Sequence, residues 1–146
     1  MDADEREFFV EEGIGDYTSG SEDGLVYKIN GCAMRVLNEL GHGLREKTYE
    51  RALCVEFRMQ QIAFEQQRVY KVFYRDEHID DYIPDLEVEG KLIVDCKTVE
   101  TICDEHLGQI LNYLKVSGLQ SGLILNFKKP RLEWRKVVLT KKTNRE

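Results

Sequence analysis

Residues 84–97 read PDLEVEGKLIVDCK, and this stretch decides the fold that we expect. Apolar side chains recur at every second position on both sides of Glu89-Gly90, which is typical of two β-strands joined by a tight turn. Directly paired residues point to the same face, so burying both apolar sets together requires even-numbered residues to pair with even-numbered ones. A three-residue turn with a glycine in the left-handed conformation provides this register. The hairpin therefore places Asp85, Asp95 and Lys97 on one common face, which we expect to lie outside the core.

The segments around this hairpin predict a mixed fold. Apolar residues at helical spacing predict three helices, over about residues 23–40, 45–60 and 103–117. Alternating or continuous apolar runs predict five strands, near residues 67–75, 79–88, 91–98, 121–127 and 132–139. Thr101 and Asp104 resemble a capping box at the start of the last helix. The order ααβββαββ indicates a single α/β domain of the α+β type, with helices flanking a central mixed β-sheet.

Length and composition indicate an ordinary globular protein. The 146 residues are about one domain, and 42% of them are apolar and 33% charged. No apolar run is long enough to span a membrane. The start, Met1-Asp2-Ala3-Asp4-Glu5, is acidic where a signal peptide would be basic and then apolar, so we expect a cytoplasmic protein. The cysteines lie in apolar segments without metal-cluster spacing, and we interpret them as reduced thiols: Cys32, Cys54, Cys96 and Cys103.

Charge is distributed unevenly along the chain. Residues 1–23 carry nine acidic residues and one arginine, and we expect a flexible acidic arm that docks through its apolar island Phe8-Phe9-Val10. This arm is also the candidate docking element for a partner protein or a second copy in a homodimer. The folded domain is expected over 24–140, followed by a basic tail at 141–146. The formal net charge of −6 therefore does not exclude DNA or RNA as a partner, because residues 126–146 alone carry +6.

The shared face of the hairpin predicts a metal site. Asp85 and Asp95 would repel each other, and a divalent cation between them removes that conflict. Oxygen-only ligands suit Mg²⁺ or Mn²⁺ better than zinc. Such an ion activates water and neutralises charge that develops on a phosphate, and Lys97 could steady that water or the phosphoryl oxygens. The alternative is an ordinary solvated strand face, against which stands the strongly apolar run 91–97, typical of a central strand.

The predicted third helix carries a polar stripe opposite its leucines. His106, Gln109 and Tyr113 recur at helical spacing. Gln109 has the neutral donor and acceptor groups that suit the binding of water or phosphate. The alternative is again a solvated helix face.

Taken together, these motifs resemble a known family. Residues 43–49, GLREKTY, match the pattern G-x-x-E-x-x-Y. They are followed first by the hairpin residues Asp85, Asp95 and Lys97 and then by the helical segment HLGQILNYL at 106–114. In this order they resemble the GxxExxY protein family of prokaryotes, within the PD-(D/E)XK nuclease-like superfamily. The resemblance covers about residues 24–139. It implies a restriction-endonuclease-like core and Mg²⁺-dependent hydrolysis of phosphodiester bonds in DNA or RNA.

The resemblance also implies roles for individual residues. Pro84-Asp85 matches the PD element, and Asp95-Cys96-Lys97 matches the (D/E)-x-K element. Glu46 matches an acid of the first helices that joins the metal site, so Glu46, Asp85 and Asp95 are the implied metal ligands. Gln109 completes the catalytic set with both aspartates and Lys97, and Tyr113 lines the pocket. Relatives usually have glutamate in place of Asp95. Because aspartate is one methylene group shorter than glutamate, it would hold the metal nearer the strand.

Further residues are candidates for contact with the substrate. Tyr49 lies one turn after Glu46 and would bind substrate or orient that acid, with packing in the core as the alternative. Lys128, Lys129 and Arg131 would follow a nucleic-acid backbone, or form a charged loop beside an edge strand. The competing function is a non-catalytic nucleic-acid-binding or assembly module that keeps the nuclease fold.

Overall fold

The computed structural model describes residues 6–17 and 24–141. Within them lie three helices, α1 (Gly24–Leu40), α2 (Glu46–Met59) and α3 (Asp104–Ser117). The strands there are β1 (Phe8–Ile14), β2 (Phe64–Gln66), β3 (Tyr70–Tyr74), β4 (Glu77–Tyr82), β5 (Leu86–Val88), β6 (Leu92–Lys97), β7 (Ser121–Asn126) and β8 (Glu133–Leu139). All three predicted helices are confirmed to within one residue at each end, because their apolar spacing is strongly periodic.

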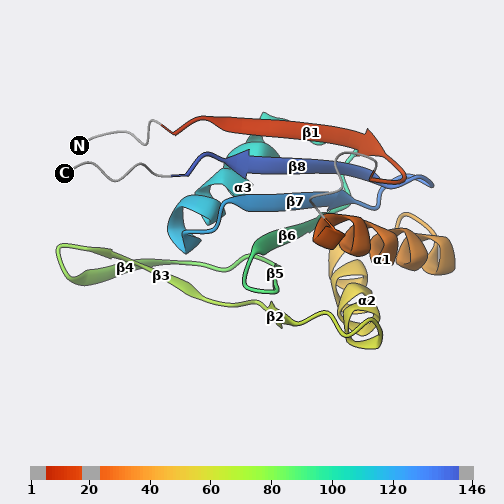
Figure 1. The fold of residues 1–146 in the computed structure, drawn as a ribbon, viewed down its shortest axis with the longest axis horizontal. Coiled ribbons are helices and arrows are strands. Elements are labelled where there is room, and N and C mark those ends of the chain that lie inside the picture. Colours follow the sequence, from red (N-terminus) through yellow and green to blue (C-terminus); the bar gives the residue numbers. More distant parts are fainter. Residues whose placement is uncertain (1–5, 18–23, 142–146) are drawn as a thin grey trace.

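Six of these strands form one mixed sheet, in the order β1-β8-β7-β6-β5-β2 (Figure 1). Strands β6 and β7 are parallel and the other neighbours are antiparallel. The parallel pair is joined through α3, since a parallel connection needs a crossover segment. The predicted class, a mixed sheet flanked by helices, is confirmed.

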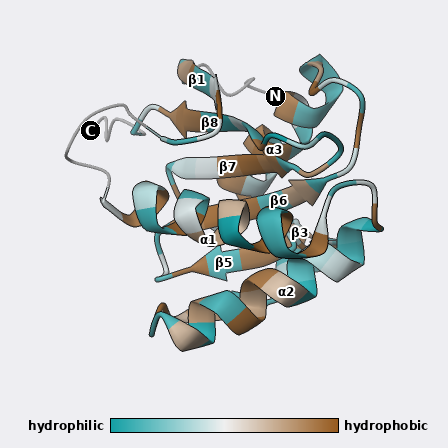
Figure 2. Cartoon of the chain, turned by 90° about the vertical axis from the view of Figure 1, so that its right-hand side faces the viewer, coloured by the Kyte–Doolittle hydropathy of each residue, from teal (hydrophilic) through white to brown (hydrophobic). Residues whose placement is uncertain are grey.

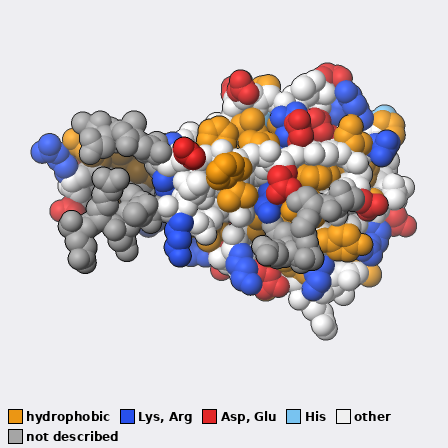
Figure 3. Space-filling model, turned by 45° about the horizontal axis from the view of Figure 1, so that its top comes forward, with side chains coloured by type: hydrophobic (Ala, Val, Ile, Leu, Met, Phe, Trp, Pro, Cys, Tyr) orange, Lys and Arg blue, Asp and Glu red, His pale blue; other side chains and the backbone are white. Residues whose placement is uncertain are grey.

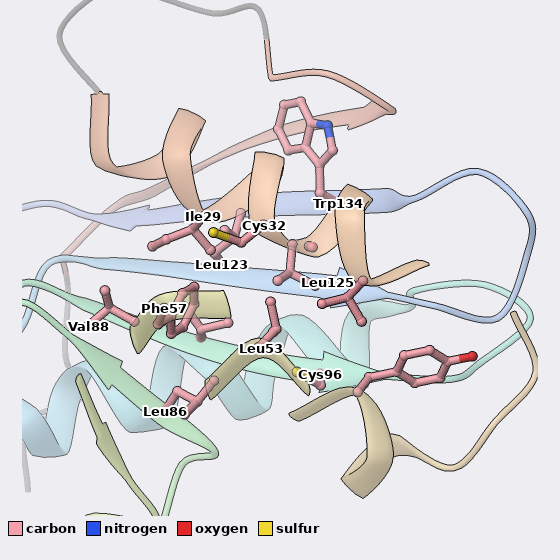
Figure 4. Packing of buried hydrophobic residues seen from close by; sticks show 14 of the residues in the cluster. Ile29, Cys32, Leu53, Phe57, Leu86, Val88, Cys96, Leu123, Leu125 and Trp134 are labelled. Atoms are coloured by element: carbon pink, nitrogen blue, oxygen red, sulfur yellow. The ribbon is translucent and has the colours of Figure 1, made fainter. Parts of the chain in front are cut away.

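Each face of the sheet has its own core. Helices α1 and α2 lie together over one face, and each shows both hydrophilic and hydrophobic residues along its length (Figure 2). Their apolar residues pack with alternate residues of the strands, among them Leu86, Cys96 and Leu123 (Figure 4). A second cluster, which includes Ile93 and Ile110, lies between the opposite face and α3.

This second core corrects one prediction. The odd-numbered face of β6, which carries Asp95 and Lys97, does not lie outside the core. It is covered by α3, and Ile93 and Asp95 are buried there with exposures of 0% and 4%. The physical reason is that the parallel connection from β6 to β7 places α3 on this face, while α1 and α2 cover the other.

Strand β1 corrects a second prediction. The acidic arm is not flexible at residues 8–14, which pair antiparallel with β8 along their whole length. The acidic side chains meet bases of β8, with Glu12 2.8 Å from Arg135. Gly13 makes room for Trp134, because a Cβ atom there would lie 2.5 Å from the indole ring. On the face that carries β1, acidic and basic side chains are interspersed with apolar ones (Figure 3).

Parts of the predicted terminal segments remain untested. Residues 1–5 and 18–23 of the predicted arm, and residues 142–146 of the predicted basic tail, lie outside the described residues. In the part of the chain that is described, no helix has both the length and the apolar character needed to cross a membrane. All four cysteines are free thiols.

The predicted strand at 79–88 is divided into β4 and β5, and the predicted strand at 67–75 is shortened to β3, with β2 lying before it. The short strand β2 and β5 join the main sheet, whereas β3 and β4 form a separate two-stranded sheet that projects away from α1 and α2 (Figure 1). Pro84 separates β4 from β5, because proline has no N–H to donate to a strand ladder and restricts the residue before it. Between β2 and β3, Gln67 has a positive φ of 57°, which ends the extended conformation.

Candidate active site

The β5–β6 hairpin positions the site, and its predicted register is confirmed. Leu86 pairs with Val94 and Val88 pairs with Leu92, so even-numbered residues face even-numbered ones. The turn consists of three residues, and Glu89 and Gly90 both have positive φ, at 56° and 64°. Asp85 precedes β5 directly and therefore lies opposite Asp95.

The two aspartates interact strongly. One oxygen of Asp85, Oδ2, accepts a hydrogen bond of 2.9 Å from the backbone N–H of Cys96. Burial, the negative charge of Asp95 and a hydrogen bond shared with it raise the pKa of Asp85 to about 8, although the Cys96 N–H opposes this rise. Two carboxylates so close together do not both ionise readily unless a cation joins them.

Lys97 links this pair to α3. Its Nζ lies 3.1 Å from Asp95 Oδ2 and donates a hydrogen bond of 2.9 Å to Gln109 Oε1. Burial lowers the pKa of Lys97, but its ion pair with Asp95 outweighs this effect, so the pKa is raised overall. Lys97 is therefore a protonated cation at neutral pH.

Gln109 in turn holds Tyr113. The amide Nε2 of Gln109 donates a hydrogen bond of 3.3 Å to the hydroxyl oxygen of Tyr113. Burial and the charges of Asp95 and Asp85 raise the pKa of Tyr113, so its phenol stays neutral. The structure thus brings Asp85, Asp95, Lys97, Gln109 and Tyr113 into one connected group.

His106, the third member of the predicted stripe, has another role. Its Nδ1 accepts a hydrogen bond of 3.0 Å from the backbone N–H of Cys103, in a capping box at the start of α3. The predicted capping box of Thr101 and Asp104 is therefore wrong: the box lies two residues later, at Cys103 and His106. Cys103 occupies the N-cap position because its backbone is extended and its partner lies three residues later.

Glu46 does not complete a metal triad in this arrangement. It is exposed at the start of α2, where Oε2 accepts a hydrogen bond of 3.2 Å from the backbone N–H of Thr98. Across residues 6–17 and 24–141, no three His, Cys, Asp or Glu side chains are grouped closely enough to hold a metal ion. Glu46 therefore lies beside the end of β6, without converging on Asp85 and Asp95.

Glu50 is an acid near the site that the sequence analysis missed. It is 2% exposed, one turn beyond Glu46 on α2, and accepts hydrogen bonds from Gln66 (2.6 Å) and Gln67 (3.1 Å) and from Lys47 (3.0 Å). Burial raises the pKa of Glu50, but these hydrogen bonds outweigh burial and lower it overall. Its negative charge also contributes to the raised pKa of Asp85. The position of Glu50, on the same helix face as Glu46, was the signal that could have revealed it.

Tyr49, in contrast, has a structural role. Its side chain is fully buried, and its ring stacks on Phe127 with centroids 4.4 Å apart. Its hydroxyl donates to the carbonyl oxygen of Gly41 (2.6 Å) and accepts from the N–H of Leu44 (3.0 Å). The structure therefore places Tyr49 in the core, which was the alternative to contact with substrate.

The basic residues Lys128, Lys129 and Arg131 lie in the loop between β7 and β8. Lys128 is 3.9 Å from Glu100, and the carbonyl oxygen of Lys128 lies 3.1 Å from Nδ1 of His42. This loop adjoins the end of β6, because the N–H of Phe127 donates to the carbonyl oxygen of Lys97 (2.8 Å). The loop therefore lies at the end of the strand that carries the site.

The donor atoms of the aspartate pair fit a divalent cation. Both side chains offer oxygen only, as Mg²⁺ and Mn²⁺ prefer. The Oδ2 atom of Asp95 is buried and receives no hydrogen bond of adequate geometry from any described residue, its contact with Lys97 being an ion pair. A buried oxygen with spare acceptor capacity beside a second carboxylate is what a metal ligand requires.

Comparison with known proteins identifies the family. The sequence profile of the PD-(D/E)XK nuclease superfamily matches residues 23–137, which include every residue of the group around Asp85 and Lys97. Strand β1 lies outside this match. No curated protein and no solved structure matches the chain. The profile match, the mixed sheet with flanking helices and the Asp-Asp-Lys arrangement agree, and the chain belongs to the PD-(D/E)XK nuclease superfamily.

Proposed function

We propose that the protein is a metal-dependent nuclease that hydrolyses phosphodiester bonds of DNA or RNA. The observation that carries this proposal is the pair formed by half-buried Asp85 and buried Asp95, with Lys97 Nζ 3.1 Å from Asp95. Membership of the superfamily supports it. The G-x-x-E-x-x-Y motif at 43–49 favours the GxxExxY branch.

The aspartates would hold Mg²⁺ or Mn²⁺. Such an ion supplies an activated water and neutralises negative charge on the phosphate. Glu46 and Glu50 would add negative charge around the ion. Glu46 lies on α2 beside the end of β6, and the charge of Glu50 contributes to the raised pKa of Asp85.

Lys97 would act as a cation and hydrogen-bond donor. The charge of Asp95 raises its pKa and favours the protonated form, which donates hydrogen bonds. It would stabilise negative charge that develops on the phosphoryl oxygens. Gln109 would fix the direction of its ammonium group through the 2.9 Å hydrogen bond.

The basic loop would bind the nucleic-acid backbone. Lys128, Lys129 and Arg131 adjoin the end of β6, where a strand leaving the aspartates would pass. Phosphate contacts of this kind give affinity without sequence selectivity, and they weaken as salt rises.

Cleavage of labelled single- and double-stranded DNA and RNA with Mg²⁺ or Mn²⁺ tests the proposal. We expect Asp95→Asn to abolish metal-dependent cleavage while the chain stays folded. The matched control is Asp76→Asn in the β3–β4 turn, where Asp76 is exposed with a φ of 65° that asparagine tolerates well. Cleavage that survives Asp95→Asn, in protein purified identically, contradicts the assignment. Nucleic-acid binding without cleavage under all these conditions favours the non-catalytic binding module.

A further inference from the structure

A pocket of about 200 Å³ adjoins the candidate active site. It lies between the end of β4 with its following linker and the middle of α3, and its walls are Asp81, Tyr82, Ile83, Gln109, Asn112 and Tyr113. Gln109 belongs to both places, since it lines the pocket and accepts the hydrogen bond from Lys97. The pocket is therefore one side chain away from the cation that faces the aspartates.

Two tyrosine rings meet in this pocket at a right angle. The centroids of Tyr82 and Tyr113 are 6.2 Å apart and the ring planes are inclined by 89°. A planar ring that stacks on one tyrosine meets the other along its edge. The hydrogen bond from Gln109 fixes Tyr113, so this corner is preorganised on the side nearest Lys97.

The remaining walls suit the edge of a heterocyclic base. Asn112 is exposed and offers both a donor and an acceptor, and Asp81, whose Oδ1 already contacts His78, offers Oδ2 as an acceptor. Ile83 is 41% exposed and adds an apolar surface. Aromatic faces with a few polar groups at the rim are the means by which proteins bind unstacked bases.

We propose that this pocket binds one unpaired nucleobase next to the bond that is cleaved, so that the substrate is a single strand or a strand with an unpaired nucleotide. This inference rests on the proposed function and specifies its substrate class. In a duplex, neighbouring bases occupy both faces of each base and its partner occupies the edge. A base must leave the stack to bind between the rings of Tyr82 and Tyr113. The free-energy cost of this step is lowest for an unpaired base.

A labelled single-stranded oligonucleotide, with one abasic residue moved stepwise along it, tests the pocket. Fluorescence anisotropy in EDTA or Ca²⁺ measures binding, and cleavage with Mg²⁺ is followed separately. Stacking of a base on an aromatic ring changes affinity by roughly 5- to 100-fold. We expect a loss of that size when the abasic residue reaches one position, and an equal loss for Tyr82→Ala on the intact oligonucleotide. In Tyr82→Ala the abasic residue should have no further effect.

Matched variants separate stacking from folding. Tyr82→Phe keeps the ring and should bind as the unaltered protein does. Tyr74→Ala removes a tyrosine that is 55% exposed on the same hairpin and outside the pocket, and should change nothing. Equal binding of abasic and intact strands, or binding unaffected by Tyr82→Ala, overturns the inference. So does a complete lack of nucleic-acid binding, or a loss in Tyr82→Ala that Tyr82→Phe shares.

The two proposals can fail separately. If binding is sensitive to the abasic position but no bond is cleaved, the pocket stands and the nuclease assignment fails. If duplex and single strands are cleaved at equal rates and Tyr82→Ala cleaves normally, the nuclease assignment stands and the pocket fails.

Discussion

Two hairpins that follow each other in the chain have opposite environments. In β3–β4 no strand residue is buried, whereas in β5–β6 eight of the nine strand residues are buried. Both hairpins are antiparallel and both carry aspartates, and only the Ile83-Pro84-Asp85 segment separates them. Two antiparallel hairpins thus place similar side chains in different surroundings: those of β3–β4 lie in water, and those of β5–β6 lie within the two cores.

The difference decides what an aspartate can do. Asp81 in the exposed hairpin lies 2.5 Å from His78 at the surface, where water screens its charge. Asp95 is buried, and one of its oxygens has no hydrogen bond from the described residues. A buried carboxylate is costly unless a cation compensates it. The proposed metal ligand Asp95 accordingly lies on the buried hairpin, and the proposed base-binding residue Tyr82 lies on the exposed one.

The largest expected effect tests burial itself. Ile93→Ala in β6 removes a side chain that is 0% exposed and leaves a cavity beneath α3, so we expect the free energy of unfolding to fall by about 2–5 kcal/mol. Ile79→Ala in β4 removes a side chain that is 61% exposed and should change the free energy of unfolding by about 0.5 kcal/mol or less. Urea unfolding followed by circular dichroism measures both. Equal losses would contradict the exposure of the β3–β4 hairpin.

A second test compares one lysine from each hairpin. Lys97→Met removes the donor beside Asp95 with little change in side-chain length, and we expect cleavage to slow by about 10²- to 10³-fold. Lys71→Met in β3 removes an exposed charge, worth at most ~1 kcal/mol, and should slow cleavage by no more than about fivefold. Single-turnover cleavage of the preferred strand gives both rates. A comparable loss in the two variants would argue against a special role for the half-buried Lys97.

The third and smallest effect concerns the pH dependence of stability. Asp85 has a pKa raised to about 8 in the folded chain, against about 3.9 when unfolded. Between these values the folded chain holds a proton that the unfolded chain releases, so the free energy of unfolding falls as pH rises from 4 to 8. Asp85→Asn cannot titrate, and we expect it to be more stable than the unaltered protein at pH 8, on the order of 2 kcal/mol, with little difference at pH 4.

Urea unfolding in EDTA at several pH values measures this change. Adding Mg²⁺ at pH 8 should stabilise the unaltered protein and have less effect on Asp85→Asn, because the proposed metal site requires both aspartates to be ionised. Parallel pH curves for the two proteins would contradict the raised pKa.

The sequence by itself determined much of this protein. The helices follow from apolar spacing, and the β5–β6 register follows from an alternation that only one pairing can bury. That register alone predicted that Asp85, Asp95 and Lys97 share a face. Local patterns suffice here because each depends on residues close together in the chain.

Tertiary structure decided the rest, since the remaining features depend on segments far apart in the chain. Strand β1 forms because β8, with its paired residues 119 to 131 positions later, offers backbone partners and basic side chains to an acidic segment. The face that carries Asp95 becomes a core only because α3 covers it. Glu50 reaches its buried position through Gln66 and Gln67, and Tyr82 meets Tyr113 across a hairpin and a helix. Periodicity reports which face of an element is apolar, but only the packing of distant elements determines what covers that face and which charges it isolates from water.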